Sequence, residues 1–136
     1  MQIESVMTRH VHFCRRDDSL DAAARVMWDA DCGCLPVVDP CGELVGVITD
    51  RDICMAAYTR GQPLRQLRVA DAMAKTVIIC RPEDSTQHAE RMMSTHRVRR
   101  LPVVGGRGEL VGMLSRTDIA RGACRDAAPV AAERRE

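Results

Sequence analysis

Two pairs of side chains recur in this sequence at one spacing, each a hydroxyl followed three residues later by a carboxylate. The first pair is Thr49 and Asp52, and the second is Ser115 and Asp118. A hydroxyl donates to a phosphate or ribose oxygen, and a carboxylate offers two acceptor oxygens, enough for both hydroxyls of a ribose. Where a strand ends and a helix begins, free backbone N–H groups and the positive helix end favour anions. The pairs therefore indicate a site for a phosphorylated or ribose-containing ligand.

The same pairs also have a purely structural explanation. Thr and Ser cap helices, and an Asp in the first turn complements the helix dipole by about 0.3–1 kcal/mol. A single copy favours that explanation. Between the two copies, however, Asp50-Arg51 is replaced by Arg116-Thr117, whereas the hydroxyl and the carboxylate keep their type and spacing. This divergence around an unchanged pair favours a binding site.

The pairs belong to a longer internal repeat. Leu-Pro-Val-Val occurs at 35–38 and 101–104, and Gly-Glu-Leu-Val-Gly at 42–46 and 108–112. The correspondence holds without a gap from Met7 and Met73 onward, with about two positions in five identical, far above chance for unrelated segments. The chain therefore contains two copies of one supersecondary unit.

Apolar periodicity and turn residues predict the element order β-α-β-β-α in each copy. In the first helix Leu20, Ala23, Ala24 and Met27 share one face behind an N-cap at Ser19. The elements expected in the first copy are strand 11–13, helix 20–30, strands 35–38 and 44–48, and helix 50–58. Those expected in the second copy are strand 77–79, helix 85–96 with Ala89, Met92, Met93 and His96 mainly on one face, strands 101–104 and 110–114, and helix 116–123.

These elements predict an α/β (α+β) fold in which the two repeats bury their apolar faces against each other about a pseudo-twofold axis. The expected boundaries are repeat 1 at 3–60, a linker at 61–68, repeat 2 at 69–124, and a disordered tail at 125–136. A chain of 136 residues is long enough for the two repeats to share one core.

Composition excludes several classes of protein. The net charge is +1 and the chain has one Phe, one Tyr and one Trp, which disfavours nucleic-acid binding because that needs a basic excess and aromatic stacking. No apolar run reaches the roughly 18–20 residues of a membrane span, and the N-terminus lacks a signal-peptide pattern. The seven cysteines have no regular disulfide spacing, so a reduced cytoplasmic location is expected.

The repeated motifs resemble those of the CBS-domain family. Each copy has Leu-Pro-Val-Val, then Gly-Glu-Leu-Val-Gly, then Gly-x-x-(Thr/Ser)-x-x-Asp, and the resemblance covers about residues 3 to 123. Members of that family that consist of one CBS pair are small regulatory modules that bind adenine nucleotides or S-adenosylmethionine and that commonly form homodimers. The resemblance implies the same here, with AMP, ADP, ATP or S-adenosylmethionine as a regulatory ligand and an unknown effector protein as partner.

The resemblance also implies the residues of two clefts, each taking the hydroxyl and Asp from one repeat and a strand from the other. Arg99 and Arg100 match a pair that contacts phosphates in nucleotide-binding members, and arginine forks suit phosphate oxygens; the alternative is a solvated charged edge. The residues implied for the cleft of the first pair are Thr49, Asp52, Val77, Ile78, Arg99 and Arg100. Those implied for the other cleft are Ser115, Asp118, Thr8, Val11, His12 and Cys34.

The first repeat departs from this pattern. It has Gly33-Cys34 where the second has Arg99-Arg100, so two equivalent nucleotide sites are not expected. A single occupied cleft, or one cleft that takes a less charged ligand, fits the sequence better.

Two other functions stay open beside the adenosyl-ligand sensor. The chain fits a ligand-free dimerisation or protein-interaction module, and Cys32 and Cys34 could make a thiol or metal sensor. Structural zinc needs four ligands at recognisable spacing, which the sequence lacks, and Cys14 and Cys80 are repeat equivalents expected to fill the core. No nucleophile, base and orienting group are linked by a motif, so no enzyme, catalytic residue or bound metal is expected.

Overall fold

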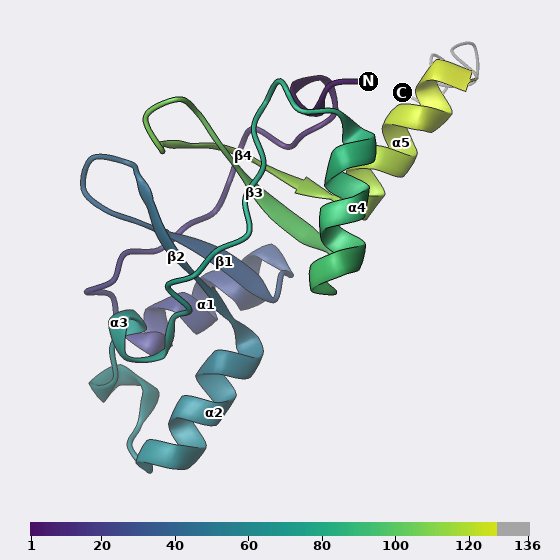
Figure 1. Ribbon diagram of the computed structural model, residues 1–136. Helices are drawn as coiled ribbons and strands as arrows, with labels where there is room; N and C mark the ends of the chain where they lie inside the picture. Colours follow the sequence, from purple (N-terminus) through teal and green to yellow (C-terminus); the bar gives the residue numbers. More distant parts are fainter. Residues whose placement is uncertain (128–136) are drawn as a thin grey trace. The chain divides into compact units, whose positions relative to one another are not determined.

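The computed structural model describes residues 1–127, which form two compact units (Figure 1). Unit 1 contains Met1–Val11, Ile78–Gly106 and the chain from Val111 onward, and unit 2 contains His12–Val77 and Arg107–Leu110. Helices and small two-stranded sheets make up both units, which confirms the predicted fold class. The pseudo-twofold packing of the repeats stays a prediction.

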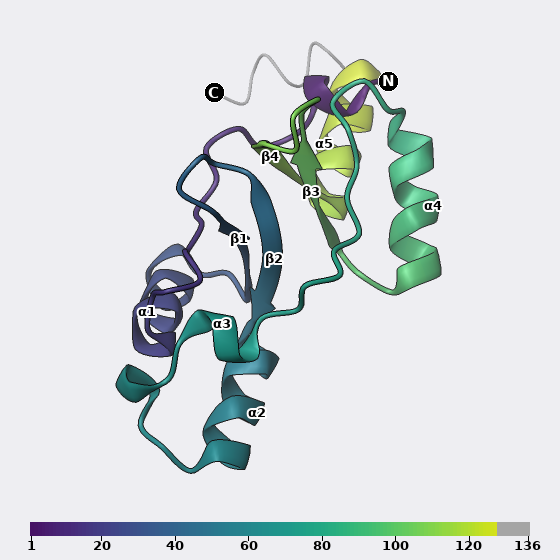
Figure 2. The ribbon, with the colours of Figure 1, turned by 60° about the vertical axis from the view of Figure 1, so that its left-hand side comes forward.

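Unit 2 is built on a two-stranded antiparallel sheet with helices against it (Figure 2). Leu35 pairs with Ile48, and both are fully buried. In the hairpin loop the Asp39 carboxylate accepts the N–H groups of Cys41 and Glu43, and Gly42 has φ 87°, a conformation that glycine adopts without strain. The elements of unit 2 are α1 (Leu20–Ala30), β1 (Cys34–Val38), β2 (Leu44–Thr49), α2 (Asp50–Arg60), the 3₁₀ turn η2 (Leu64–Gln66) and α3 (Val69–Ala72).

The first helix of unit 2 begins and packs as its sequence predicts. The Ser19 hydroxyl accepts the N–H of Ala22 at 3.0 Å, satisfying one of the backbone donors that a helix leaves open at its start. Leu20, Ala23 and Met27 are buried in one core cluster with β1 and β2. The spacing of apolar residues therefore placed the helix and its buried face correctly.

Unit 1 repeats this arrangement of a two-stranded sheet and helices (Figure 2), and it has its own core. Ala89 and Met93 of one helix pack with Leu101, Leu114 and the other apolar residues of a second cluster. His96, expected on the same face, is exposed, because it lies at the last residue of the helix. The elements of unit 1 are the 3₁₀ turn η1 (Ile3–Ser5), α4 (Thr86–His96), β3 (Arg100–Val104), β4 (Leu110–Ser115) and α5 (Arg116–Ala127), of which Leu110 belongs to unit 2.

Each unit combines most of one repeat with the leading segment of the other, which is residues 1–11 for the first repeat and 69–77 for the second. Ile3 and Met7 lie at the start of the first repeat but are buried in the core of unit 1, whereas Val69 and Met73 lie at the start of the second repeat and are buried in the core of unit 2. Thr8 bridges to Met113 of β4 in the same way. This exchange brings residues from the start of the chain to the end of β4.

The predicted first strand of each repeat is wrong. Residues 11–13 and 77–79 form no strand, and pairing is limited to the single residues Cys14 and Cys80. Cys14 donates to the carbonyl of Pro36 and accepts from Val38. The next backbone hydrogen bond of this pairing toward the N-terminus would need an N–H donor at position 36, and proline has none. Pro102 has the same place beside Cys80.

Several predicted boundaries also need correction. Helix α2 continues to Arg60, two residues beyond its predicted end, and Gly61 ends it with φ 62°; the expected linker at 61–68 contains η2. The short helix α3 was not predicted. Helix α5 continues to Ala127, so 125–127 is helical where a tail was expected, and residues 128–136 of that tail lie outside the described part. No helix within residues 1–127 is long and apolar enough to cross a membrane.

Candidate functional site

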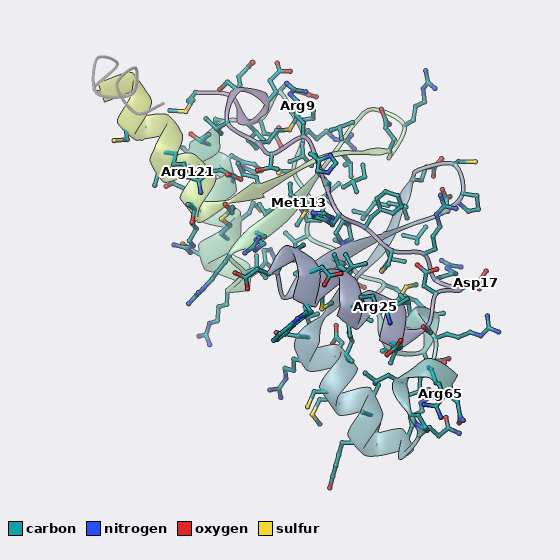
Figure 3. All side chains as sticks on the ribbon, turned by 180° about the vertical axis from the view of Figure 1, so that it is seen from behind. Arg9, Asp17, Arg25, Arg65, Met113 and Arg121 are labelled. Atoms are coloured by element: carbon teal, nitrogen blue, oxygen red, sulfur yellow. The ribbon has the colours of Figure 1, made fainter. Side chains whose placement is uncertain are left out.

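The second hydroxyl–carboxylate pair lies where β4 passes into α5 in unit 1. Figure 3 labels Met113 of β4 and Arg121 of α5, the two elements that meet there. The N–H of Ser115 donates to Asp118 Oδ2 at 3.0 Å, and the Ser115 hydroxyl accepts the N–H of Asp118 at 3.0 Å. This reciprocal pattern is a capping box. It fixes both side chains at the start of the helix, and the capping explanation of the pair is therefore correct for its local structure.

The capping box does not use every polar atom of Ser115 and Asp118, so some remain available to a ligand. Among residues 1–127 the Ser115 hydroxyl proton has no protein acceptor. Asp118 is only 9% exposed, and its Oδ1 faces Arg121 Nη1 at 3.8 Å. The pair can cap the helix with one set of atoms and offer a donor and an acceptor with another.

Thr8 joins this corner from the leading segment. Its N–H donates to the carbonyl of Met113 at 2.8 Å, and the N–H of Met113 donates back at 2.9 Å. Gly112 permits this approach, since a Cβ there would lie 2.7 Å from Met7 Sδ and 3.0 Å from the Thr8 carbonyl oxygen. The Thr8 hydroxyl then donates to both Asp118 oxygens, at 3.3 and 3.4 Å.

Arg99 and Arg100 line a cavity of about 570 Å³ together with Ser115, a volume in the usual range for small-molecule sites. Its walls are residues 97–100 and 115–117. The structure thus brings Arg99 and Arg100 to one cavity with Ser115, next to Asp118 and Thr8, whereas the resemblance implied these arginines for the cleft of Thr49 and Asp52. Our prediction omitted Arg97, Arg116 and Thr117 from the site, although the change of charge between repeats at 31/97 and 50/116 was visible in the sequence.

The first pair forms an equivalent corner in unit 2, between β2 and α2. Thr49 and Asp52 make the same capping box at 3.0 and 3.1 Å, and Cys34 is paired with Thr49 across the hairpin. Ala74 occupies the place of Thr8, since Val47 and Ala74 exchange backbone hydrogen bonds. This corner therefore lacks the third hydroxyl found in unit 1.

Four further residues that the resemblance implied lie where the chain passes from one unit to the other, at 11–12 and 77–78. Val11 and Val77 are half-buried, Ile78 packs against the core of unit 1, and His12 is exposed. Val77 and His12 belong to unit 2, whereas Val11 and Ile78 belong to unit 1. Their contact with a ligand stays a prediction.

All seven cysteines are thiols, and two of them are core residues as expected. Burial, helped by the nearby charge of Asp18, raises the pKa of Cys14 to about 12, and burial with Asp84 does the same for Cys80. Thiols with so high a pKa stay protonated and unreactive near neutral pH. Within residues 1–127 no group of three or more His, Cys, Asp or Glu side chains is arranged to hold a metal ion.

Comparison with known proteins places these corners in a family. The family model "CBS domain" matches residues 3–58 and 69–123. The uncharacterized protein YlbB of Bacillus subtilis is 33% identical over 119 residues, which cover 87% of this chain and 79% of that protein. Inosine-5'-monophosphate dehydrogenase of Korarchaeum cryptofilum is 34% identical over 116 residues, which cover 85% of this chain but 23% of the enzyme. This chain is thus similar to one part of that enzyme.

Among solved structures, the fold is similar to that of CBSX2, determined in complex with AMP. The TM-score is 0.82 with 28% identity, and the match covers 93% of this chain and 98% of that one. Both family matches begin in the leading segments that are exchanged between the units, and both end in the helix that follows a hydroxyl–carboxylate pair. The chain therefore belongs to the CBS-domain family and carries two CBS repeats.

Proposed function

We propose that this protein is a regulatory module that binds an adenosyl ligand at the Ser115/Asp118 corner and signals its occupancy to an effector protein. The observation that carries the proposal is that Ser115 and two arginines line one cavity of unit 1, while Asp118 is hydrogen-bonded to Ser115 and Thr8 to Asp118. Carboxylate and hydroxyls suit a ribose, and arginines suit phosphate. The AMP complex of CBSX2 supports an adenine nucleotide as the ligand.

In the proposed complex Val11 supplies an apolar contact to the adenine, and His12 and Cys34 also contact this ligand. Thr49, Asp52, Val77 and Ile78 form the second cleft, which takes a less charged adenosyl ligand such as S-adenosylmethionine. Ligand binding acts as a signal because the ligand has different affinities for two arrangements of the protein. No catalytic step is part of the proposal.

Thermal unfolding with AMP, ADP, ATP, S-adenosylmethionine and NAD tests the function. A ligand at 100 times its Kd stabilises a folded protein by about 2.7 kcal/mol, which gives a clear rise in Tm. The ligand-induced shift should disappear in Asp118→Ala, compared with the variant's own ligand-free Tm. If no adenosyl compound shifts the wild-type Tm, the proposed function is wrong.

A second function, self-association, is favoured by exposed aromatic side chains in unit 2. Trp28 on α1 is 84% exposed and Tyr58 on α2 is 81% exposed, although aromatic side chains are enriched in interfaces and core positions. We propose that α1 and α2, which contact each other, form a homodimer interface through these side chains. Sedimentation velocity should show a dimer in wild type and a monomer in Trp28→Ser/Tyr58→Ser; a wild-type monomer would contradict it.

A further inference from the structure

The cavity of unit 1 has an unusual concentration of uncompensated positive charge. Four of its seven lining residues are arginines, namely Arg97, Arg99, Arg100 and Arg116, and all four are exposed. Within the described residues none of them is paired with a carboxylate. Like charges gathered without counter-charges repel one another, so an anion entering the cavity would relieve that repulsion as well as accept hydrogen bonds.

Two segments hold these arginines in place. Arg97 and Arg99 lie in the connection from α4 to β3, Arg100 begins β3, and Arg116 is the first residue of α5. The N–H of Arg116 donates to the carbonyl of Arg99 at 3.2 Å, which ties the two segments together. Arg116 Nη2 lies 3.5 Å from Ser94 Oγ, a weak contact that leaves its other guanidinium donors available.

The equivalent corner of unit 2 has the opposite charge at the same positions. Asp31 stands in place of Arg97, and Asp50 in place of Arg116. Gly33 replaces Arg99, and a Cβ at Gly33 would lie only 2.9 Å from Asp50 Oδ2, so the Asp50 carboxylate lies close against the backbone there. Aspartates at this corner repel a phosphate instead of attracting it.

Arg97 stands at a backbone position that disfavours arginine. It ends α4 with φ 56° and ψ 44°, the left-handed region that glycine and asparagine or aspartate adopt most readily. The counterpart in unit 2 is Asp31 with φ 54°. A residue in a strained conformation beside a cavity is a reason to look for a functional role, and here that role is charge.

We propose that the four-arginine cavity of unit 1 binds a chain of two or more phosphate groups, so that ADP and ATP bind there in preference to AMP. Arg97 and Arg116 supply the charge for the phosphates beyond the first, and the aspartates of unit 2 exclude such a chain from the equivalent corner. This inference rests on the proposed function for the adenosine part of the ligand. It adds that the ligand carries two or more phosphates and that unit 1 alone accepts them.

Isothermal titration calorimetry with AMP, ADP, ATP and inorganic tripolyphosphate tests the inference on the full chain. One additional charge-assisted contact corresponds to about tenfold in affinity, so ATP should bind wild type at least ~10-fold more tightly than AMP. Arg97→Gly/Arg116→Glu should bring the ATP and AMP affinities to within about twofold of each other. Arg91→Glu, at an exposed position of α4 outside the cavity, is the control for the charge reversal at Arg116 and should keep the wild-type ratio.

The outcomes separate the inference from the proposed function. If AMP and ATP bind wild type equally well, or if the double variant keeps the ratio, the inference is wrong while adenosyl binding stands. If tripolyphosphate binds wild type, is lost in Arg116→Glu, and no adenosine compound binds more tightly than tripolyphosphate, the cavity takes polyphosphate and the adenosyl function is wrong. If neither tripolyphosphate nor any nucleotide binds, both are wrong. Circular dichroism of each variant checks that it is folded.

Discussion

The hydroxyl of Thr8 donates to the carboxylate of Asp118, although the two residues are 110 positions apart in the chain. The distances of 3.3 and 3.4 Å exceed the roughly 2.7–2.8 Å of a strong O–H···O bond. The bond is therefore weak in the ligand-free protein, and the hydroxyl can turn toward a ligand at little cost. The exchange of leading segments creates this pair, because it places Thr8 beside β4 and not beside its own repeat.

Replacing Thr8 with valine should weaken nucleotide binding without destabilising the fold. One hydrogen bond contributes about 1 kcal/mol, so we expect the Kd to rise roughly fivefold. The free energy of unfolding should change by less than about 0.5 kcal/mol, since Thr8 is exposed. Calorimetry and urea denaturation measure the two effects.

Thr76→Val is the matched control, because Thr76 is exposed and lies in unit 2. It should leave the Kd unchanged. Equal Kd values for wild type, Thr8→Val and Thr76→Val would show that the Thr8 hydroxyl does not take part in binding.

The two capping carboxylates should make similar contributions to stability. Asp118→Ala and Asp52→Ala each remove the side chain that accepts the N-cap N–H, and we expect each to lower the free energy of unfolding by about 1 kcal/mol. Urea denaturation of both variants measures this. Unchanged stability in either one would mean that the capping box is not formed in solution.

Arg97→Gly should raise stability while weakening ATP binding. Glycine adopts the left-handed conformation of this position without strain, so the free energy of unfolding should increase by about 0.5–1 kcal/mol. A more stable variant that binds ATP more weakly cannot be explained by unfolding. A decrease in Tm without ligand would contradict the assignment of strain to Arg97.

Much of the fold could be predicted because local signals agree with tertiary packing. Ser19 caps a helix that begins at the expected residue, the helix expected from residue 85 begins one residue later with Ser85 as its cap, and the apolar runs at 35–38 and 101–104 are buried strands. The first strands could not be predicted correctly, because Pro36 and Pro102 limit pairing to one residue only when placed opposite Cys14 and Cys80.

The exchange of leading segments has no local signal. The sequence places Ile3 in the first repeat and Val69 in the second, and only three-dimensional packing shows that Ile3 joins the core of unit 1 and Val69 the core of unit 2. The four-arginine cavity was partly predictable, since Arg99 and Arg100 were identified from the motif, although the resemblance implied them for the cleft of Thr49 and Asp52 and not for the cavity with Ser115. Arg97 and Arg116 were not identified, because their role depends on the connection from α4 to β3 lying against the start of α5.

Gly46→Ala should be strongly destabilising. A Cβ at position 46 would lie 2.7 Å from the carbonyl oxygen of Ala74, which is backbone held by two hydrogen bonds to Val47. We expect a loss of about 1–3 kcal/mol in the free energy of unfolding, as for overpacked cores. Gly106→Ala, where a Cβ would meet nothing within 4 Å, is the control and should change stability by less than about 0.5 kcal/mol. Equal stability of the two variants would contradict the close approach.

Stability should fall in alkaline solution because of the two buried thiols. Burial raises the pKa of Cys14 and Cys80 from 9.0 to about 12, so between these pH values the unfolded chain has lost thiol protons that the folded chain keeps. The free energy of unfolding therefore decreases as the pH rises from 9 toward 12. Urea denaturation at pH 8.5 and pH 10.5 should show this decrease in wild type and a smaller one in Cys14→Ala/Cys80→Ala. The same decrease in both proteins would assign it to other groups.

The stoichiometry of ATP binding tests the central claim most directly. Calorimetric titration of the full chain should give one ATP per chain, with the heat abolished by Asp118→Ala and retained by Asp52→Ala, because only the unit 1 corner combines the carboxylate with Thr8 and the arginines. Absence of binding to wild type, or binding that survives Asp118→Ala and is lost in Asp52→Ala, would contradict the account.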